Sequence, residues 1–207
     1  MRNFSFVSRV RIMAREENRR ITDIGTLKAL AHPLRMRLYR LLFVAEAATA
    51  SQLAEQVDEA VSLVSYHLRK LAEHGLVEEA EPRSADARER WWQPSSEGVT
   101  IRDEDFRDAP EKAAAHLAAS RMFLEQRAGM YRRYLDERAH WGPGWNTAAH
   151  DSESLLRLTA GELAELKKDL TDLLKRYDER GRAREAAGDT EGREHVALHV
   201  YGFPFRV

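Results

Sequence analysis

Apolar residues recur at helical spacing between residues 22 and 74 of the chain. In the segment 61–74, Val64, Leu68 and Leu71 fall at i, i+4 and i+7, which places them on one face of a helix. Similar patterns occur in three earlier segments. The sequence therefore predicts four successive helices, at residues 22–31, 33–44, 49–57 and 61–74.

The boundaries of these helices carry recognisable signals. His32 precedes Pro33 and is disfavoured in helical conformation, whereas Pro33 suits the first position of the next helix. Thr49 and Gln52 have the spacing of a capping box. Gly75 falls where a left-handed residue commonly ends a helix.

The pattern changes after Gly75. Two short strand candidates, 76–81 and 88–94, are joined by a polar segment and predict a hairpin. A linker with one short strand follows Pro94. The remaining chain predicts a long helix at 110–140 ended by "WGPGW", a second helix at 159–180, a polar loop at 181–194 and a terminal strand at 195–207.

These elements predict a mostly helical α+β protein with three parts. Residues 1–20 are expected to be a basic, possibly disordered arm, residues 21–95 a helix-turn-helix with a hairpin, and residues 96–207 a helical domain with a short terminal strand. Helices joined by three or four residues, as at 49–57 and 61–74, have helix-turn-helix spacing. In that arrangement the second helix enters the DNA major groove.

The face of the segment 61–74 opposite its apolar stripe carries Ser62, Ser65, Tyr66 and Arg69, with Lys70 alongside. Short hydroxyls can donate to phosphates or bases, and an arginine can pair with guanine or clamp a phosphate. The alternative is an ordinary solvated helix face. Periodicity alone leaves both interpretations open.

The overall charge counts mildly against a nucleic-acid partner. The net charge is −1, and residues 60–93 hold five basic side chains against six acidic ones. Residues 1–20 carry six arginines and two glutamates, a net of +4. Electrostatic attraction to DNA should therefore be modest for one copy, and a second copy or the basic arm would have to add to it.

The segments "LKALAHPLRMRLYRLL", "SQLAEQV", "SLVSYHLRKLAEHGLVEEA" and "RERWW" together resemble the winged helix-turn-helix domain of ArsR-like transcriptional regulators over residues 24–93. The resemblance implies that 61–74 is the recognition helix and that 76–93 is the wing. One departure is Ala60, where the family often has a serine or glycine cap. This weaker cap could cost about 1 kcal/mol, unless the helix starts at Ser62.

The resemblance also implies the positions that face DNA. His67 is either one of them or a buffer between core and phosphate, and Lys70 is either a phosphate contact or simply exposed. The expected DNA-binding residues are Ser62, Ser65, Tyr66, His67, Arg69, Lys70, Arg83, Arg88 and Arg90.

No catalytic residue, metal site or cofactor is expected. The chain has no cysteine, so thiolate metal sites are excluded. His195 and His199 would stand about 13 Å apart on a strand, too far to share one ion. Neither a phosphate-cradling glycine loop nor a catalytic triad is recognisable, and an enzyme is not expected.

Aromatic residues near "WGPGW" offer a candidate effector pocket for a small apolar molecule. The alternative is that they only fill the joint between the two long helices. The residues in question are Tyr131, Tyr134, Trp141 and Trp145.

The resulting expectation is a homodimeric, sequence-specific regulator of transcription that binds double-stranded DNA. Repression is expected, with activation as the alternative, and the helix 110–140 is the expected dimerisation element. No membrane partner is expected and the location should be cytoplasmic, because no apolar run approaches the ~20 residues of a membrane span and residues 1–20 lack a secretory signal. The competing class is a winged-helix protein-interaction module that does not bind DNA.

Overall fold

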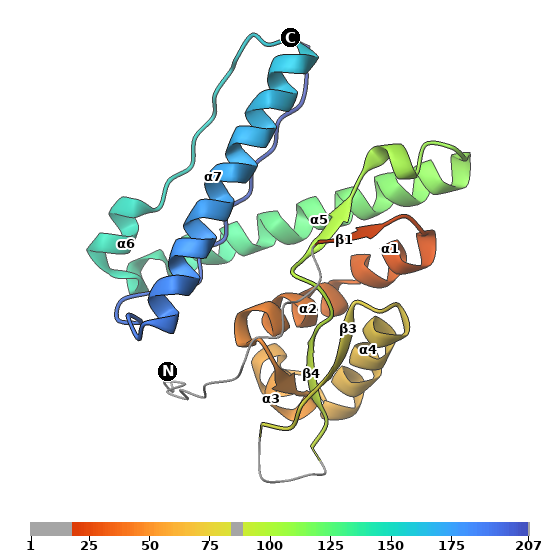
Figure 1. Ribbon diagram of the computed structural model, residues 1–207, viewed down its shortest axis with the longest axis vertical. Helices are drawn as coiled ribbons and strands as arrows, with labels where there is room; N and C mark the ends of the chain where they lie inside the picture. Colours follow the sequence, from red (N-terminus) through yellow and green to blue (C-terminus); the bar gives the residue numbers. More distant parts are fainter. Residues whose placement is uncertain (1–17, 84–88, 207) are drawn as a thin grey trace. The chain divides into compact units, whose positions relative to one another are not determined.

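The structure, a computed structural model, describes residues 18–83 and 89–206 (Figure 1). The chain divides into two compact units, residues 1–132 and 133–207. Each unit is described by itself below.

Four helices of the first unit confirm the predicted pattern closely. Asp23 caps the first helix by accepting from the Thr26 amide, and the Thr49–Gln52 capping box forms as expected. Pro33 occupies the first turn of the second helix. The helices are α1 (Ile24–Ala31), α2 (Pro33–Ala45), α3 (Ala50–Val57) and α4 (Val61–Glu73).

The predicted hairpin is present. Strands β3 (Val77–Ala80) and β4 (Trp91–Pro94) pair antiparallel, with Glu79 opposite Trp92. A two-residue strand, β2 (Ala48–Thr49), pairs with the other side of β4 and gives the order β2-β4-β3. Because β2 leads directly into α3, this sheet fixes the hairpin beside the helices (Figure 1).

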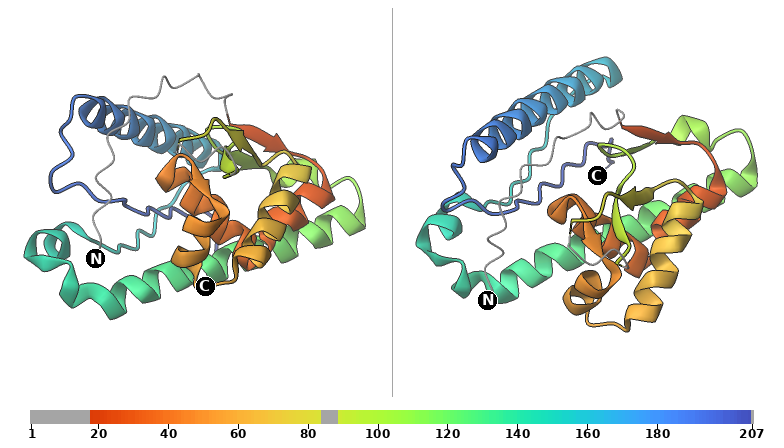
Figure 2. Two further views of the ribbon diagram at one scale, coloured as in Figure 1. Left: turned by 90° about the horizontal axis from the view of Figure 1, so that it is seen from below. Right: turned by 60° about the horizontal axis from the view of Figure 1, so that its bottom comes forward.

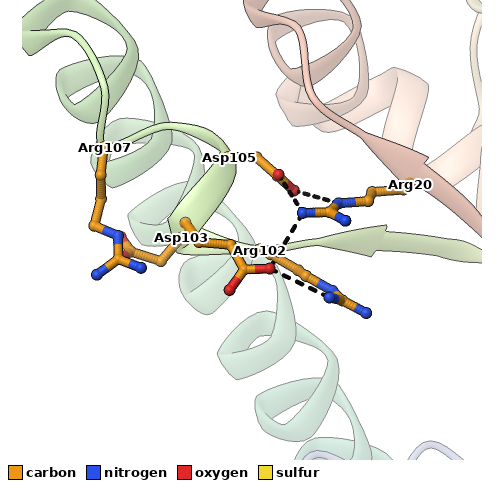
Figure 3. Close-up of polar contacts among 6 residues, drawn as sticks. Arg20, Arg102, Asp103, Asp105 and Arg107 are labelled. Carbon is orange, nitrogen blue, oxygen red and sulfur yellow. Dashed lines mark hydrogen bonds and ion pairs between the residues drawn. The ribbon is translucent and has the colours of Figure 1, made fainter.

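A second, two-stranded sheet joins the beginning of the described chain to the segment after the hairpin. β1 (Arg19–Ile21) runs parallel to β5 (Val99–Ile101), which leads to a short 3-10 helix, η1 (Asp103–Asp105). Arg20 of β1 forms ion pairs with Asp105 and Glu104 (Figure 3). Residues 19 and 20, assigned to the arm by the sequence prediction, are therefore part of the folded unit; residues 1–17 lie outside the described residues.

The core of the first unit lies between the helices and both sheets. Leu27, Leu38, Leu53 and Leu68, one from each of the four helices, have no exposed surface. Phe106 is also buried, and Ala119 and Phe123 extend the core to α5 (Pro110–Glu137). The first half of α5 therefore packs against this core, and its ribbon passes α1 and β1 (Figures 1 and 2).

This packing moves the unit boundary relative to the sequence prediction. Residues 96–132, expected to belong to a separate C-terminal domain, fall in the same unit as the helix-turn-helix. The reason is the burial of Phe106, Ala119 and Phe123 in the shared core. Helical periodicity in the sequence shows a buried face but does not identify which partner covers it.

The second unit contains the end of α5, a short 3-10 helix, η2 (Arg138–His140), and the helices α6 (Gly142–Ala148) and α7 (Ala160–Ala186). α5 ends at Glu137, before the predicted residue 140, and η2 separates it from "WGPGW", whose last four residues form the first turn of α6. The helix predicted at 159–180 continues to Ala186, so the polar loop begins later than expected. Within the described residues, no helix has both the length and the apolar character needed to cross a membrane.

The predicted terminal strand was wrong. Residues 195–206 form no strand, and Val196, Leu198 and Val200 are 70%, 51% and 54% exposed. A strand requires a neighbouring backbone with which to pair. Gly202 instead packs against the side chain of Leu163 on α7.

Candidate nucleic-acid interface

α4 begins and ends at defined backbone signals. Ala60 precedes it without a side-chain cap, and the helix starts at Val61, not later at Ser62. At the other end Gly75 has φ +61°, the Gly75 amide donates to Ala72 O at 2.8 Å, and the Leu76 amide donates to Leu71 O at 2.9 Å. This is the Schellman arrangement, and it confirms the C-terminal cap expected at Gly75.

The two faces of α4 separate as the apolar pattern predicts. Val64, Leu68 and Leu71 are fully buried. Ser62, Tyr66 and Arg69 are exposed on the other face, and Ser65 is partly exposed. Arg69 donates to the Ser65 carbonyl oxygen of its own helix at 3.3 Å. A row of two hydroxyls, a phenol and a guanidinium is thereby presented to solvent.

Lys70 differs from Arg69 because its charge already has a partner. Its Nζ lies 2.7 Å from Glu73 Oε2, and this hydrogen bond raises the pKa of Lys70. The same Nζ lies 5.9 Å from the centre of the Tyr66 ring. The structure places Lys70 in an ion pair on the surface of α4.

A hollow of about 400 Å³ lies between α4, the start of α3 and the wing. Ser65 and Arg69 line it from α4, and Arg90 and Trp92 line it from the wing. The rest of the lining comes from the β2–α3 junction, the start of α4 and the residue before Arg90: Thr49, Ala50, Ser51, Val61 and Glu89. The first amide groups of a helix have no hydrogen-bond partner within that helix. The start of α3 therefore offers backbone N–H donors to the hollow, in addition to the guanidinium groups of Arg69 and Arg90.

The predicted wing residues have different surroundings. Arg90 lies 3.2 Å from Glu79 and over the ring of Trp92 at 5.7 Å. Arg83 lies 3.8 Å from Glu46, which follows α2. Arg88 lies outside the described residues. Arg90 therefore shares the hollow with Arg69, whereas Arg83 is paired elsewhere.

His67 points away from the exposed face of α4. Its side chain is 6% exposed, and its ring lies 4.6 Å from the ring of His32, measured between centroids. Burial, the His32 ring and the Arg35 guanidinium lower the pKa of His67. α4 turns position 67 toward the α1–α2 junction, so His67 lies beside the core, which is the second of the two alternatives given by the sequence.

The four aromatic residues of the predicted effector pocket do not share one unit. Tyr131 belongs to the first unit, while Tyr134, Trp141 and Trp145 belong to the second. Trp141 and Trp145 meet edge to face, with ring centroids 6.4 Å apart. Within the described residues there is also no group of three or more His, Cys, Asp or Glu arranged to hold a metal ion.

Three arginines that the sequence analysis did not single out contact helix C-termini. Arg35 donates to the carbonyl oxygens of Lys28 and Ala29 at the end of α1. Arg37 donates to those of Gln56 and Val57 at the end of α3. Arg19 does the same at the end of α4. Short separations of six and seven residues could have suggested the Arg35 contacts, but no local signal indicates the Arg19 contact, which spans more than fifty residues.

The arrangement of α2, α3, α4 and the β3–β4 hairpin defines a winged helix-turn-helix domain. Residues 30–80 match a family model described as a helix-turn-helix domain, which is less than half of the chain. The predicted helix-turn-helix is confirmed for this segment.

Several solved structures are similar to part of the chain. One is a possible transcriptional regulator for arsenical resistance, 28% identical over 48% of this chain and 83% of that chain, with a TM-score of 0.31. Another is an ArsR family transcriptional regulator, 25% identical over 49% and 88%, with a TM-score of 0.29. Reduced HlyU from Vibrio cholerae is 21% identical over 46% and 83%, with a TM-score of 0.32. No curated protein matches the chain.

Proposed function

We propose that this chain binds double-stranded DNA in a sequence-specific manner and regulates transcription. The observation that carries the proposal is the joint placement of Ser65, Arg69 and Arg90 around one hollow, with Ser62 and Tyr66 exposed on the same helix. α4 would enter the major groove, where Arg69 can pair with a guanine edge or a phosphate. The wing would follow the adjacent backbone.

The start of α3 supports the same orientation. The N-terminus of a helix carries partial positive charge and free amide donors, which favour an anion. Ala50 and Ser51 lie at that end and line the hollow beside Arg69. A backbone phosphate in this position would meet neutral donors as well as a guanidinium, which is useful on a surface where Glu79 and Glu73 already pair with Arg90 and Lys70.

We further propose that the protein acts as a homodimer through α5. Leu117, Leu124 and Tyr131 are 51%, 50% and 40% exposed and recur every seven residues, the spacing of a seam between parallel-packed helices. Leu135, 45% exposed, lies four residues beyond Tyr131. A two-fold dimer would present two copies of α4 to half-sites one helical turn apart.

Repression is the proposed outcome of operator binding, since a bound dimer blocks access to the duplex. A small apolar effector remains part of the proposal, with Trp141 and Trp145 of the second unit as the aromatic surface it would contact. Tyr134 belongs to the same unit, while Tyr131 belongs to the proposed α5 seam.

Selection of duplexes from a random library tests DNA binding directly. The native protein should enrich a sequence with two-fold symmetry, and Tyr66→Ala should weaken binding to it. Arg107→Ala, which changes an arginine paired with Asp103 outside the proposed interface, is the matched control. Failure of the native protein to enrich or shift any duplex at low salt would favour the protein-interaction module.

A further inference from the structure

The C-terminus of the recognition helix is held by a residue far away in the sequence. Arg19 Nη1 donates to the carbonyl oxygen of His74 at 2.6 Å and also to that of Gly75. The last carbonyls of a helix lack partners within it and carry partial negative charge, so a guanidinium is well suited to them. The contact therefore adds a charged cap to the Schellman turn of α4.

The fit between Arg19 and this turn is close. A Cβ atom placed on Gly75 would lie 2.7 Å from Arg19 Nη1, nearer than real Cβ contacts allow. Gly75 also has φ +61°, a conformation that favours glycine. Glycine is thus needed here both for the turn and for the approach of the guanidinium.

The backbone at Arg19 is itself held in place by hydrogen bonds to β5 and to the residue before it. The Arg19 amide donates to Gly98 O at 2.9 Å, and β1 pairs with β5 along its whole length. The next residue, Arg20, reaches Asp105 and Glu104 in η1 (Figure 3). Phe106 follows η1 and stacks on His116 of α5, with ring centroids 5.3 Å apart.

We propose that Arg19 is a positioning residue for DNA recognition: it fixes the C-terminal end of α4, so that Arg69 is presented in a defined place. The proposal rests on the proposed function, because α4 must be the DNA-reading helix. It also gives β1 a role distinct from that of a basic arm. Arg19 acts through the helix and touches no phosphate.

The two roles of an arginine, positioning and phosphate contact, differ in measurable ways. Losing a phosphate contact lowers the slope of log affinity against log salt by about one. Losing a positioning contact leaves that slope unchanged but loosens the helix end in the free protein. Amide hydrogen exchange at Gly75 and Leu76, whose amides close the Schellman turn, reports this loosening.

The test compares the native protein with Arg19→Ala, using the enriched duplex at several salt concentrations and hydrogen exchange without DNA. We expect exchange at Gly75 and Leu76 to accelerate about threefold to tenfold, affinity to fall by a similar factor, and the salt slope to stay the same. Arg19→Lys, which keeps the charge and one donor, should recover part of both effects.

Arg102→Ala is the matched control, because Arg102 pairs with Glu104 in the same polar cluster (Figure 3) and should leave exchange and affinity unchanged. Native exchange at Gly75 and Leu76 in Arg19→Ala, or a salt slope reduced by about one, would overturn the positioning role. If the native protein binds no duplex, the proposed function fails, and the positioning role in DNA recognition is overturned with it; accelerated exchange would then show only a structural cap.

Discussion

The two units of this chain differ in how their apolar residues are used. In the first unit, every helix from α1 to α4 contributes a side chain without exposed surface, and distant segments meet through paired strands and arginine caps. In the second, none of the described residues from 133 to 206 is buried. Leu173, Leu174 and Tyr177 of α7 are all more than a third exposed.

The first unit buries apolar side chains in a core of its own, whereas the described residues of the second unit do not. The first unit has a buried core, a polar helix face and a wing, and its exposed apolar side chains include Leu117, Leu124 and Tyr131 of α5. The second exposes large apolar side chains, a feature typical of surfaces that bind another protein or a ligand. The proposed DNA interface lies in the first unit, and the proposed protein and effector contacts lie on α5 and in the second unit.

The largest expected effect of substitution lies in the core of the first unit. Leu68→Ala removes a side chain with no exposed surface from α4 and should lower the free energy of unfolding by about 2–5 kcal/mol. Leu198→Ala, in the second unit at 51% exposure, should change it by less than about 0.5 kcal/mol. Chemical denaturation measures the free energy of unfolding of both variants. Equal losses of that free energy would contradict the difference in packing between the two units.

Oligomeric state should respond to the exposed seam of α5. Leu124→Arg places a charge among apolar residues at seven-residue spacing and should convert a dimer to a monomer, as read by sedimentation equilibrium. Glu125→Gln changes the next residue, whose carboxylate pairs with Arg132, and should leave the mass unchanged. A native protein that is already monomeric at micromolar concentration would contradict dimerisation through α5.

Acid should destabilise the first unit through His67. Its folded-state pKa is lowered from the ordinary value of 6.5 by burial, His32 and Arg35, so below that value the unfolded chain binds more protons. The stabilising contribution is therefore complete above pH ~6.5 and is lost as the pH falls through the folded-state pKa. The melting temperature between pH 7.5 and 5 should fall less steeply in His67→Gln than in the native protein. The exposed His140→Gln should keep the native slope.

The smallest expected effect comes from substitution of a helix cap, and it should differ between two caps of the same chemistry. Thr49 and Thr159 both form capping boxes, but Thr49 is 3% exposed and begins a helix packed in the core. Thr49→Ala should reduce the stability of the first unit by about 1 kcal/mol. Thr159→Ala should instead accelerate amide exchange in the first turn of α7 without altering unfolding of the first unit. The reverse result would argue that α7, not α3, is the more strongly packed helix.

Features that depend on near neighbours in the sequence could be predicted, and features that depend on distant partners could not. Thr49, Gly75 and the apolar stripe of α4 act through neighbours within a few residues, and the structure confirms all three. The position of His67 required knowledge of which helix covers it, so its burial against His32 was not predicted. The Arg19 contact and the absent strand at 195–206 depend on partners far away in the sequence, which local patterns do not reveal.

The central claim is that the exposed face of α4 reads duplex DNA, and an NMR titration of the native protein with its enriched duplex tests it most directly. The account predicts shifts at the amides of Ser62, Ser65, Tyr66 and Arg69, together with a loss of about 1–3 kcal/mol of binding free energy in Arg69→Ala. Shifts confined to α7, with native affinity in Arg69→Ala, would contradict it.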